Sequence, residues 1–470
     1  MSFQRVCFAL IVSLLIAFGS VVFAGDNGGI PEKLVKKLNQ TDYSNPEKAM
    51  MNIVANKSIK DIALNRETFI EHNKYMGFKI KTGSITNQKS SGRCWMFSGL
   101  NVVRPQMMKN LEVDELELSQ NYLMFWDKME KFNRFLQYMI DFADRGLDDR
   151  ELQLVIDGPG GDGGWWSYFT GLIKKYGLVP KEIMPETYNS SSSGYMNSFL
   201  RLTAKEMAAK LRQGYKDGVS KKELETTKQE MMTEIYRILV YNLGQPPTEF
   251  EWRHKTSDTT VEGTITEKFT PKEFAEKAIS DNLDDYIALF NYPGKDFNKN
   301  YSLEMSRNMY DEPNFTIVNV PIDTMIIYAQ KSILDSTPVW FACDVGKETY
   351  NKDGIMALDI YDYESILGTE FNMTKKDMIQ LWMISPTHAM AFMGIDTADG
   401  KPRKWLVENS WGGDKGADGY WYMYDDWFRR YMFGVIIHKR YLSKELVKIA
   451  ESKPTILPPW DPMYALTKLQ

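Results

Sequence analysis

QKSSGRCWMFS, residues 88–98, joins a polar loop to an apolar run and carries a cysteine at the junction. From Trp95 onward the apolar residues recur with helical spacing, so we predict that a buried helix begins at this cysteine. A thiol at a helix N-terminus ionises more readily, because the unpaired backbone amides there favour a negative charge. Cys94 is therefore a candidate nucleophile, although an isolated cysteine before an apolar helix is more often a core residue.

A thiol nucleophile needs a base, and one histidine stands at the start of a predicted strand. His388 opens the apolar segment 388–395, and Asn409 follows the predicted strand 404–408. Adjacent strands would bring the two residues together, with the asparagine amide oxygen accepting from one ring nitrogen and the other ring nitrogen facing the thiol. Trp411 would cover that hydrogen bond. Each residue alone is weak evidence, whereas the combination indicates thiol catalysis.

An acyl-transfer site also needs hydrogen-bond donors for the oxyanion that forms during attack. Gln88 lies on the same loop as Cys94 and offers a side-chain amide beside the backbone N–H of the cysteine. We therefore predict that Gln88 helps to form an oxyanion hole. The glycine cluster 158–164 (GPGGDGG) is consistent with a plain turn-rich loop, and it is no phosphate loop because no Lys-Ser or Lys-Thr follows it.

Composition excludes several classes of function. The chain has 470 residues, 43% of them hydrophobic, which is typical of a globular protein with one large or several smaller domains. Lys and Arg total 57 against 62 for Asp and Glu, and no dense basic run exists, so we expect no nucleic-acid partner. Four histidines, without a CxxC or HExxH motif, argue against a metal site, and no cofactor is expected.

The first 24 residues have the pattern of a secretory signal peptide. Arg5 precedes the apolar run 6–18, Gly19 and Ser20 follow it, and small or branched residues occupy the cleavage-type positions of the segment 22–24, so we expect cleavage after Ala24. The apolar run is short for a transmembrane span, so we expect an exported protein, periplasmic or extracellular, that has no stable span after cleavage. Cys94 and Cys343 are then the remaining cysteines, and we interpret Cys343 as a buried strand residue.

The order of helical and strand patterns indicates an α+β protein with an inserted helical subdomain. Charged helical patterns fill residues 196–243, and strand patterns dominate from residue 315. The predicted division is a signal peptide 1–24, an N-terminal segment 25–85, a helical half 86–190 with the nucleophile, a mainly helical insertion 191–314, a β-rich half 315–450 with the histidine and asparagine, and a C-terminal arm 451–470.

Taken together, these motifs resemble the papain-like cysteine peptidases and, more narrowly, the bleomycin hydrolase and aminopeptidase C family. The matching stretches are QKSSGRCWMFS at 88–98, LSQNY at 118–122, WDK at 126–128, GDGG at 161–164, WFACDVGK at 340–347, HAM at 388–390 and ENSWG at 408–412. The separation of 294 residues between Cys94 and His388 (388 − 94) exceeds the roughly 130–150 of papain-type enzymes. The predicted insertion accounts for the excess.

The resemblance implies a papain-like fold, with a helical domain and a β-barrel-like domain, and a cysteine aminopeptidase that cleaves peptides near a free N-terminus through a thiolate acyl-enzyme. Its implied roles are nucleophile for Cys94, general base for His388, orienting residue for Asn409, oxyanion donor for Gln88, and substrate contacts for Gly163, Gly164, Trp411 and Gln470. It also implies a hexamer assembled through the insertion. The C-terminal carboxylate, on Gln470, would pair with the α-amino group of the substrate.

Two alternatives remain open at this point. An endopeptidase with the same chemistry would result if the C-terminal arm left the cleft open. A catalytically idle binding or assembly protein with the papain fold is the second alternative, against which the complete set of Cys94, His388, Asn409 and Gln88 argues. Dependence on a free amine separates the first alternative from an aminopeptidase, and covalent labelling of the thiol separates the second.

Overall fold

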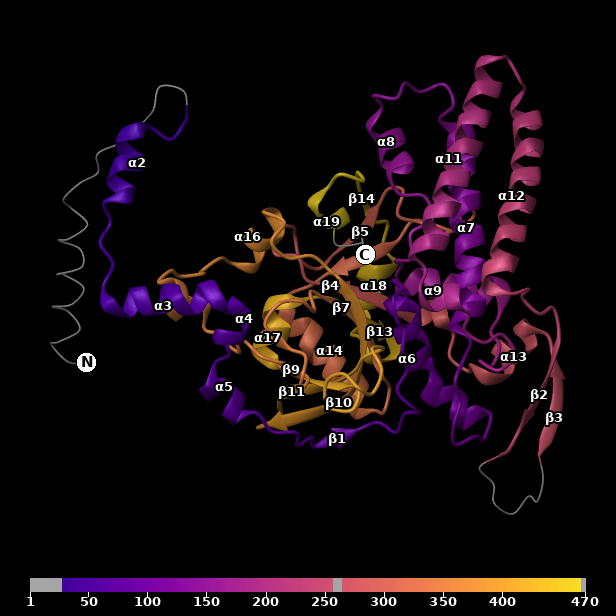
Figure 1. Cartoon of the computed structure of the whole chain (residues 1–470). Coiled ribbons are helices and arrows are strands. Elements are labelled where there is room, and N and C mark those ends of the chain that lie inside the picture. Colours follow the sequence, from indigo (N-terminus) through magenta and orange to yellow (C-terminus); the bar gives the residue numbers. More distant parts are fainter. Residues whose placement is uncertain (1–27, 257–263, 466–470) are drawn as a thin grey trace. The chain divides into compact units, whose positions relative to one another are not determined.

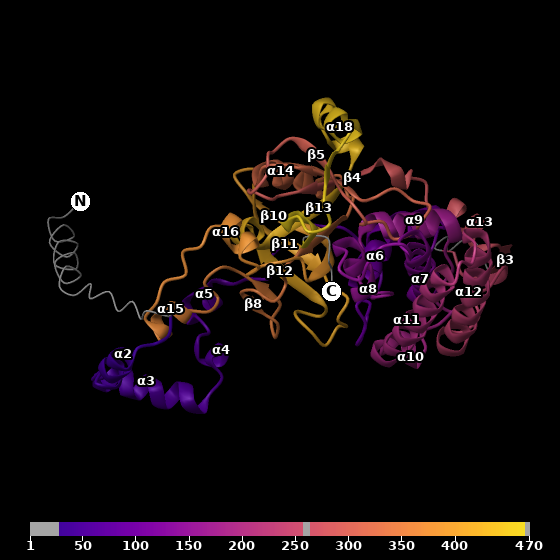
Figure 2. The same ribbon diagram turned by 90° about the horizontal axis from the view of Figure 1, so that it is seen from above.

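The computed structural model describes residues 28–256 and 264–465, which form two compact units (Figures 1 and 2). The predicted signal peptide, 1–24, and Gln470 lie outside the described residues. The first unit comprises residues 28–64 together with 363–368, and the second contains the rest of the described chain. No helix in the described ranges combines the length and apolarity needed to cross a lipid bilayer.

The first unit consists of short helices. They are α2 (Glu32–Asn39), α3 (Asn45–Asn56), α4 (Ile59–Ile62) and α15 (Tyr363–Leu367). Helix α3 begins at a capping box, in which the Ser44 hydroxyl accepts from the Glu47 amide and the Glu47 carboxylate accepts from the Ser44 amide. None of the residues of α2, α3 or α4 is fully buried, so this unit holds little apolar core of its own.

The second unit opens with helices, as predicted for its N-terminal half. These are α5 (Arg66–Glu71), α6 (Cys94–Asn110), α7 (Gln120–Asp141), α8 (Arg150–Asp157), α9 (Trp166–Tyr176) and α10 (Tyr188–Ser191). The predicted start of a helix at Cys94 is confirmed to the residue. Helix α7 begins where the Ser119 hydroxyl accepts from the amide of Tyr122, which satisfies one of the free donors at the helix start.

Two long antiparallel helices, α11 (Gly194–Lys216) and α12 (Lys221–Leu243), form the core of the insertion and lie beside α7 (Figure 1). Their buried residues recur every three or four positions: Met196, Leu200, Ala204, Met207, Ala208 and Leu211 on α11, and Leu224, Met231, Ile235, Leu239 and Leu243 on α12. This confirms the helical pattern predicted for 196–243. The hairpin β2 (Phe250–His254) and β3 (Ile265–Phe269) and helix α13 (Pro271–Ala278) follow.

The C-terminal part of the second unit is built on a twelve-stranded mixed sheet in the order β14-β5-β6-β4-β13-β7-β10-β11-β12-β9-β8, with β1 paired to β10. The strands are β1 (Phe78–Lys79), β4 (Tyr286–Phe290), β5 (Lys299–Leu303), β6 (Thr316–Asn319), β7 (Val339–Cys343), β8 (Thr349–Tyr350), β9 (Ile355–Met356), β10 (His388–Ala398), β11 (Lys401–Glu408), β12 (Tyr420–Tyr424), β13 (Met432–His438) and β14 (Thr455–Leu457). Strands β4 and β5 precede residue 315, so the sheet takes in chain that the sequence assigns to the insertion.

Short helices complete this part of the unit. They are α14 (Ile322–Leu334), α16 (Lys375–Gln380), α17 (Asp425–Tyr431), α18 (Lys444–Glu451) and α19 (Pro462–Ala465), with 3₁₀ turns η1 (Leu283–Asp285) and η2 (Lys439–Tyr441). Helices α6 and α14 both pack on β10. Every residue of β7 is buried, and Phe341 in it stacks on Phe392 of β10 with ring centroids 4.0 Å apart. The α+β prediction is therefore confirmed.

A buried ion pair ties the helical part of the second unit to the sheet. Arg104 on α6 donates from Nη2 to Oε1 of Glu408, the last residue of β11, at 2.8 Å, and both side chains are buried. Burial raises the pKa of Glu408, and the Arg104 guanidinium opposes that rise. The two partners therefore differ in how each responds to the loss of the other. A buried carboxyl can take up a proton and become neutral, whereas a guanidinium cannot lose one in a protein.

We expect Glu408→Leu to lower the free energy of unfolding by about 3–5 kcal/mol, since it leaves the Arg104 charge buried without a partner. Arg104→Leu should cost less, because Glu408 can become neutral. The double variant Arg104→Leu/Glu408→Leu should recover much of the loss. Urea unfolding at pH 7 measures all three, and a double variant no more stable than Glu408→Leu would contradict this account.

Candidate active site

The candidate nucleophile lies at the start of a buried helix. Cys94 is the first residue of α6, and its neighbour Arg93 makes no side-chain cap, so the first amides of the helix remain available. The amides of Ala389 and Trp95 hydrogen-bond the Cys94 sulfur and favour its thiolate. Burial acts more strongly in the opposite direction, since only 2% of the residue is exposed, and raises the pKa of the thiol to about 11.

The candidate base lies beside this sulfur, on the strand whose second residue is Ala389. His388 opens β10, and its Nε2 is 2.7 Å from Oδ1 of Asn409, which directly follows the paired strand β11. An amide oxygen only accepts, so this contact assigns the proton to Nε2 and leaves Nδ1 as the acceptor. The Trp411 ring lies beside the His388 ring, with the two ring centroids 4.8 Å apart.

Burial also controls the charge of the base. His388 is buried, which lowers its pKa to about 4, while the hydrogen bond that its Nε2–H donates to Asn409 partly offsets the loss of solvent. Burial therefore favours the neutral form of each group, the thiol of Cys94 and the imidazole of His388. The imidazole is therefore in the form that can accept the proton of the thiol.

The loop before Cys94 is joined to the segment after Asn409 by backbone hydrogen bonds. The Gln88 amide donates to the Ser410 carbonyl at 2.8 Å, and the Gly412 amide donates to the Thr86 carbonyl at 3.1 Å. The Gln88 side chain is held at both ends, because its Oε1 accepts from the Ser410 hydroxyl and its Nε2 donates to the Ser91 carbonyl, each at 2.7 Å. Its second N–H is the one left for an oxyanion.

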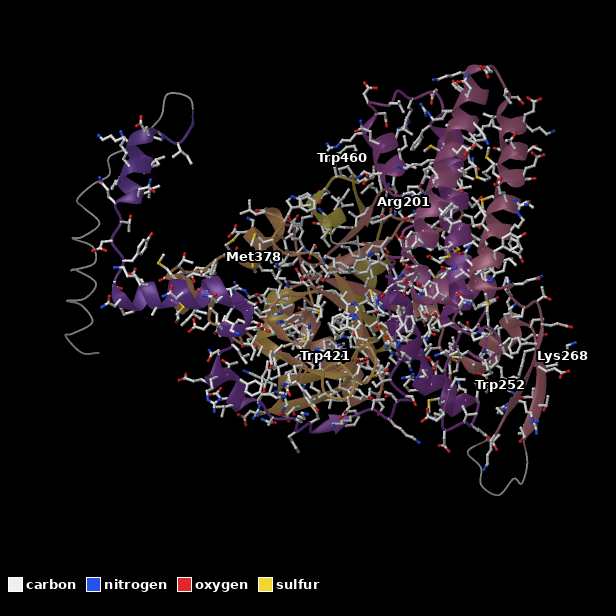
Figure 3. All side chains as sticks on the ribbon, in the orientation of Figure 1. Arg201, Trp252, Lys268, Met378, Trp421 and Trp460 are labelled. Atoms are coloured by element: carbon white, nitrogen blue, oxygen red, sulfur yellow. The ribbon has the colours of Figure 1, made fainter. Side chains whose placement is uncertain are left out.

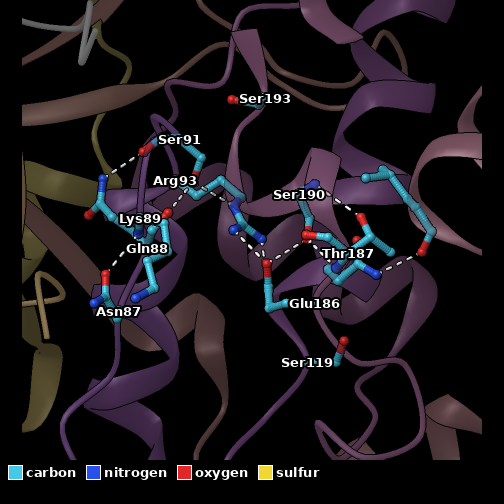
Figure 4. Close-up of polar contacts among 12 residues, drawn as sticks. Asn87, Gln88, Lys89, Ser91, Arg93, Ser119, Glu186, Thr187, Ser190 and Ser193 are labelled. Atoms are coloured by element: carbon cyan, nitrogen blue, oxygen red, sulfur yellow. Dashed lines mark hydrogen bonds and ion pairs between the residues drawn. The ribbon is translucent and has the colours of Figure 1, made fainter. Parts of the chain in front are cut away.

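An ion pair between a buried arginine and a half-buried glutamate fixes the residue immediately before the nucleophile (Figure 4). Arg93 donates from Nη1 and Nη2 to the two carboxylate oxygens of Glu186 at 3.0 and 2.7 Å, and from Nε to the Ser91 hydroxyl at 2.9 Å. The Ser190 hydroxyl donates to the same carboxylate at 2.6 Å. Such a bidentate pair sets the geometry as well as the position of the loop. Sequence reasoning missed it, although the arginine stands directly before the candidate nucleophile.

Asp162, in the middle of the glycine cluster, connects three parts of the site. Its carboxylate accepts from Lys128 of α7 at 2.6 Å and from the Gly92 amide at 3.0 Å, and its carbonyl accepts from the Trp95 indole at 2.7 Å. It also accepts from Ser193 and Asn197, at and beyond the start of α11. Burial opposes its ionisation, but the Lys128 ammonium and these donors hold its pKa well below the usual range.

A second lysine of α7 binds two further carbonyls of the glycine cluster. Lys131 donates to the carbonyls of Gly161 and Gly163 at 2.8 and 2.7 Å, and to the Asp127 carboxylate at 2.7 Å. Burial lowers its pKa to about 8, while Asp127 favours the charged form. Lysines are rarely buried unless they are paired. Two lysines on the apolar face of a predicted helix were therefore the feature of the sequence that could have indicated this buried network.

The predicted site residues do not all occupy one place. The structure joins His388 to Asn409 directly, and it joins Cys94 to Ala389, the neighbour of His388, and Gln88 to Ser410, the neighbour of Asn409. The Trp411 ring lies beside that of His388. Gly163 and Gly164 line a separate cavity of about 780 Å³, together with Ser91 and Gly92 of the nucleophile loop and parts of α7, α8 and α11. Gln470 lies outside the described residues. Cys343 is a buried free thiol in β7, opposite His388 in the strand register.

Gly164 packs directly on the Trp95 indole. A Cβ at this position would lie 2.5 Å from the ring, whose N–H is held by the Asp162 carbonyl, so the ring has little freedom to move. We expect Gly164→Ala to lower the free energy of unfolding by about 1–3 kcal/mol. Gly161→Ala is the matched control, since no atom lies within 4 Å of its Cβ position. Equal urea midpoints for the two variants would refute the packing argument.

Comparison with known proteins agrees with this geometry. The model of the Peptidase C1-like family matches residues 29–464. The chain is 36% identical to aminopeptidase C of Listeria monocytogenes, covering 90% of this chain and 95% of that protein. It is 37% identical to bleomycin hydrolase of Homo sapiens, covering 93% and 97% of the two chains.

Solved structures give the same result. The crystal structure of PepW from Lactobacillus rhamnosis HN001 superposes with a TM-score of 0.89 at 37% identity, covering 93% of this chain and 99% of that one. The papain-like α+β fold expected from the motifs is thereby confirmed, and so is the family resemblance. The chain belongs to the Peptidase C1-like family, among the cysteine aminopeptidases known as aminopeptidase C and bleomycin hydrolase.

Proposed function

We propose that Cys94, His388, Asn409 and Gln88 carry out the peptide hydrolysis of this cysteine aminopeptidase. The observation that carries the assignment is the 2.7 Å contact between His388 Nε2 and Asn409 Oδ1, next to a sulfur that the Ala389 amide hydrogen-bonds. This arrangement orients the imidazole, leaves Nδ1 to accept a proton, and places donors where a thiolate forms.

The reaction follows from these positions. His388 Nδ1 takes the proton of the Cys94 thiol, and the thiolate sulfur forms a bond to the carbonyl carbon of the substrate. The Cys94 amide and the second N–H of Gln88 stabilise the oxyanion. The imidazolium then returns its proton to the leaving amine as the C–N bond breaks. Water, deprotonated by His388, hydrolyses the remaining thioester and frees the thiol.

Cys94→Ser should abolish peptide hydrolysis, because the less acidic hydroxyl does not replace the thiol at this site. Cys343→Ser is the matched control: it alters the other described cysteine, which is equally buried, and should retain most of the activity. An epoxysuccinyl or iodoacetamide probe, located by peptide mass spectrometry, should label Cys94 only. Hydrolysis at the wild-type rate by Cys94→Ser would remove Cys94 from the mechanism.

We further propose that the C-terminal arm, 451–470, limits cleavage to the free N-terminus. The described part of the arm is anchored near the cavity beside the glycine cluster. Trp460 lies 4.4 Å from the Arg150 guanidinium at the start of α8, a helix that lines this cavity, and Asp461 pairs with Lys295 at 2.8 Å. A terminal carboxylate within reach of the cleft would form charge-assisted hydrogen bonds with a substrate ammonium.

The test compares a peptide with its N-acetylated form. The full-length enzyme should prefer the free amine by at least about tenfold in kcat/KM, the effect of one charge-assisted contact worth about 1.4 kcal/mol. Deletion of residues 464–470 should remove that preference without loss of thiol labelling. Equal cleavage of both peptides by the full-length enzyme would instead support the endopeptidase alternative.

We also propose that several copies assemble through the insertion, as the hexamer implied by the motif resemblance requires. Tyr195, Phe199 and Leu202 share one face of α11 and are 85%, 68% and 66% exposed. A stripe of large apolar side chains is costly to leave in water and is typical of a contact surface. Light scattering of the purified protein measures the number of copies.

Export of the protein is a further proposal, and it rests on the signal-peptide pattern of residues 1–24.

A further inference from the structure

The cavity beside the glycine cluster is large enough for more than one residue of a peptide. Its volume is about 780 Å³, and it is bounded by Gly92 of the nucleophile loop, Gly163, and residues of α7, α8 and α11. Gly92 is only two residues from Cys94 in the chain. The cavity therefore adjoins the loop that carries Cys94, and it is lined by the two glycines to which the resemblance assigns backbone contacts with the substrate.

Cationic side chains outnumber anionic ones in this wall. Lys89, Arg134 and Arg201 line the cavity, and none of the three forms an ion pair with another described residue. Arg201 extends from the side of α11 nearer to α8 (Figure 3). Of the two carboxylates in the lining, Asp162 already accepts from Lys128, Gly92, Ser193 and Asn197, which leaves Asp157 alone against the three cations.

This local charge contrasts with that of the whole protein, which carries a formal net charge of −5. A cationic cavity in an anionic protein is a specific feature of the site and does not follow from composition. Low-dielectric walls concentrate the field of such a cluster within a cleft. The two guanidinium groups are also planar forks that bind a carboxylate through two parallel hydrogen bonds.

We propose that the cavity is a subsite for an acidic side chain of the peptide substrate, on the amino side of the scissile bond. This inference rests on the proposed function. The carboxylate of an Asp or Glu residue would lie between Arg134 and Arg201. The apolar side chains of Phe135 and Val155 in the same wall would accommodate the methylene groups of the substrate residue.

The experiment uses peptide pairs that differ only by Glu against Gln, which have the same shape and differ in charge at pH 7. One pair has the substitution at the first residue and another at the second. At low ionic strength the Glu peptide of at least one pair should have a kcat/KM at least about fivefold higher. The preference should fall below about twofold at 0.5 M salt, where the Debye length is only a few ångströms.

Charge reversal of the wall identifies the residues responsible. Arg134→Glu and Arg201→Glu should each remove the preference for Glu, and the double variant should reverse it in favour of Gln. Lys205→Glu is the matched control, because it makes the same charge change on an exposed residue of α11 that does not line the cavity. A preference that Lys205→Glu removes equally would assign the effect to the overall charge and overturn the proposal.

The outcomes separate this inference from the function on which it rests. If Glu and Gln peptides are cleaved equally well, the enzyme is an aminopeptidase without an acidic subsite, and only the inference fails. If neither is cleaved and no probe labels Cys94, the proposed function itself fails. If deletion of residues 464–470 creates the Glu preference in a chain that otherwise lacks it, the wall binds the protein's own C-terminal carboxylate, and the substrate subsite is overturned.

Discussion

Burial of the Cys94 sulfur is the constraint on which the rest of the site depends. Removal from water raises the pKa of the thiol to about 11 and lowers that of His388 to about 4, so burial favours the neutral form of each group. Moving the proton between them creates two charges in a poorly solvated interior, which is costly unless fixed dipoles compensate. The amides of Ala389 and Trp95 and the amide oxygen of Asn409 supply those dipoles, and they act only while the geometry is maintained.

That requirement explains why the surroundings of the nucleophile are so polar. The loop before Cys94 is fixed on one side to Ser410 and Gly412, and on the other by the ion pair of Arg93 with Glu186. Lys128 and Lys131 hold the glycine cluster against α7, the helix to which both lysines belong. Buried polar networks of this kind are costly when incomplete and rigid when complete. The network thus holds loops that have no regular secondary structure in one fixed arrangement around the reacting groups.

The sequence indicated the candidate catalytic residues more clearly than the ion pairs and strands that hold them in place. Cys94, His388 and Asn409 can be selected as candidates from the sequence because each stands at the boundary of a helix or strand, where periodicity changes and a side chain is presented to a site. Arg93 with Glu186 was not found, since the two residues are 93 positions apart and a charged residue normally indicates a solvated surface. Strands β4 and β5 were missed for a related reason: they follow a long helical insertion, and such short strands carry little pattern of their own.

One indole ring has a consequence for how such an enzyme can change. The Trp95 side chain touches Gly164 on one side, donates to the Asp162 carbonyl at 2.7 Å, and belongs to the residue immediately after the nucleophile. Its own carbonyl accepts from the Trp340 indole in the sheet at 3.0 Å. The backbone of the glycine cluster and the backbone that carries the thiol are therefore held together through this one side chain. Evolution cannot remodel the glycine cluster to admit a new substrate without disturbing the loop that carries Cys94, whereas Arg134 of α7 and Arg201 of α11 line the same cavity and form no ion pair with the cluster. Divergence in substrate preference among enzymes built this way should accumulate at such unpaired cavity-lining positions of α7 and α11, leaving the glycines and the side chains that hold them unchanged.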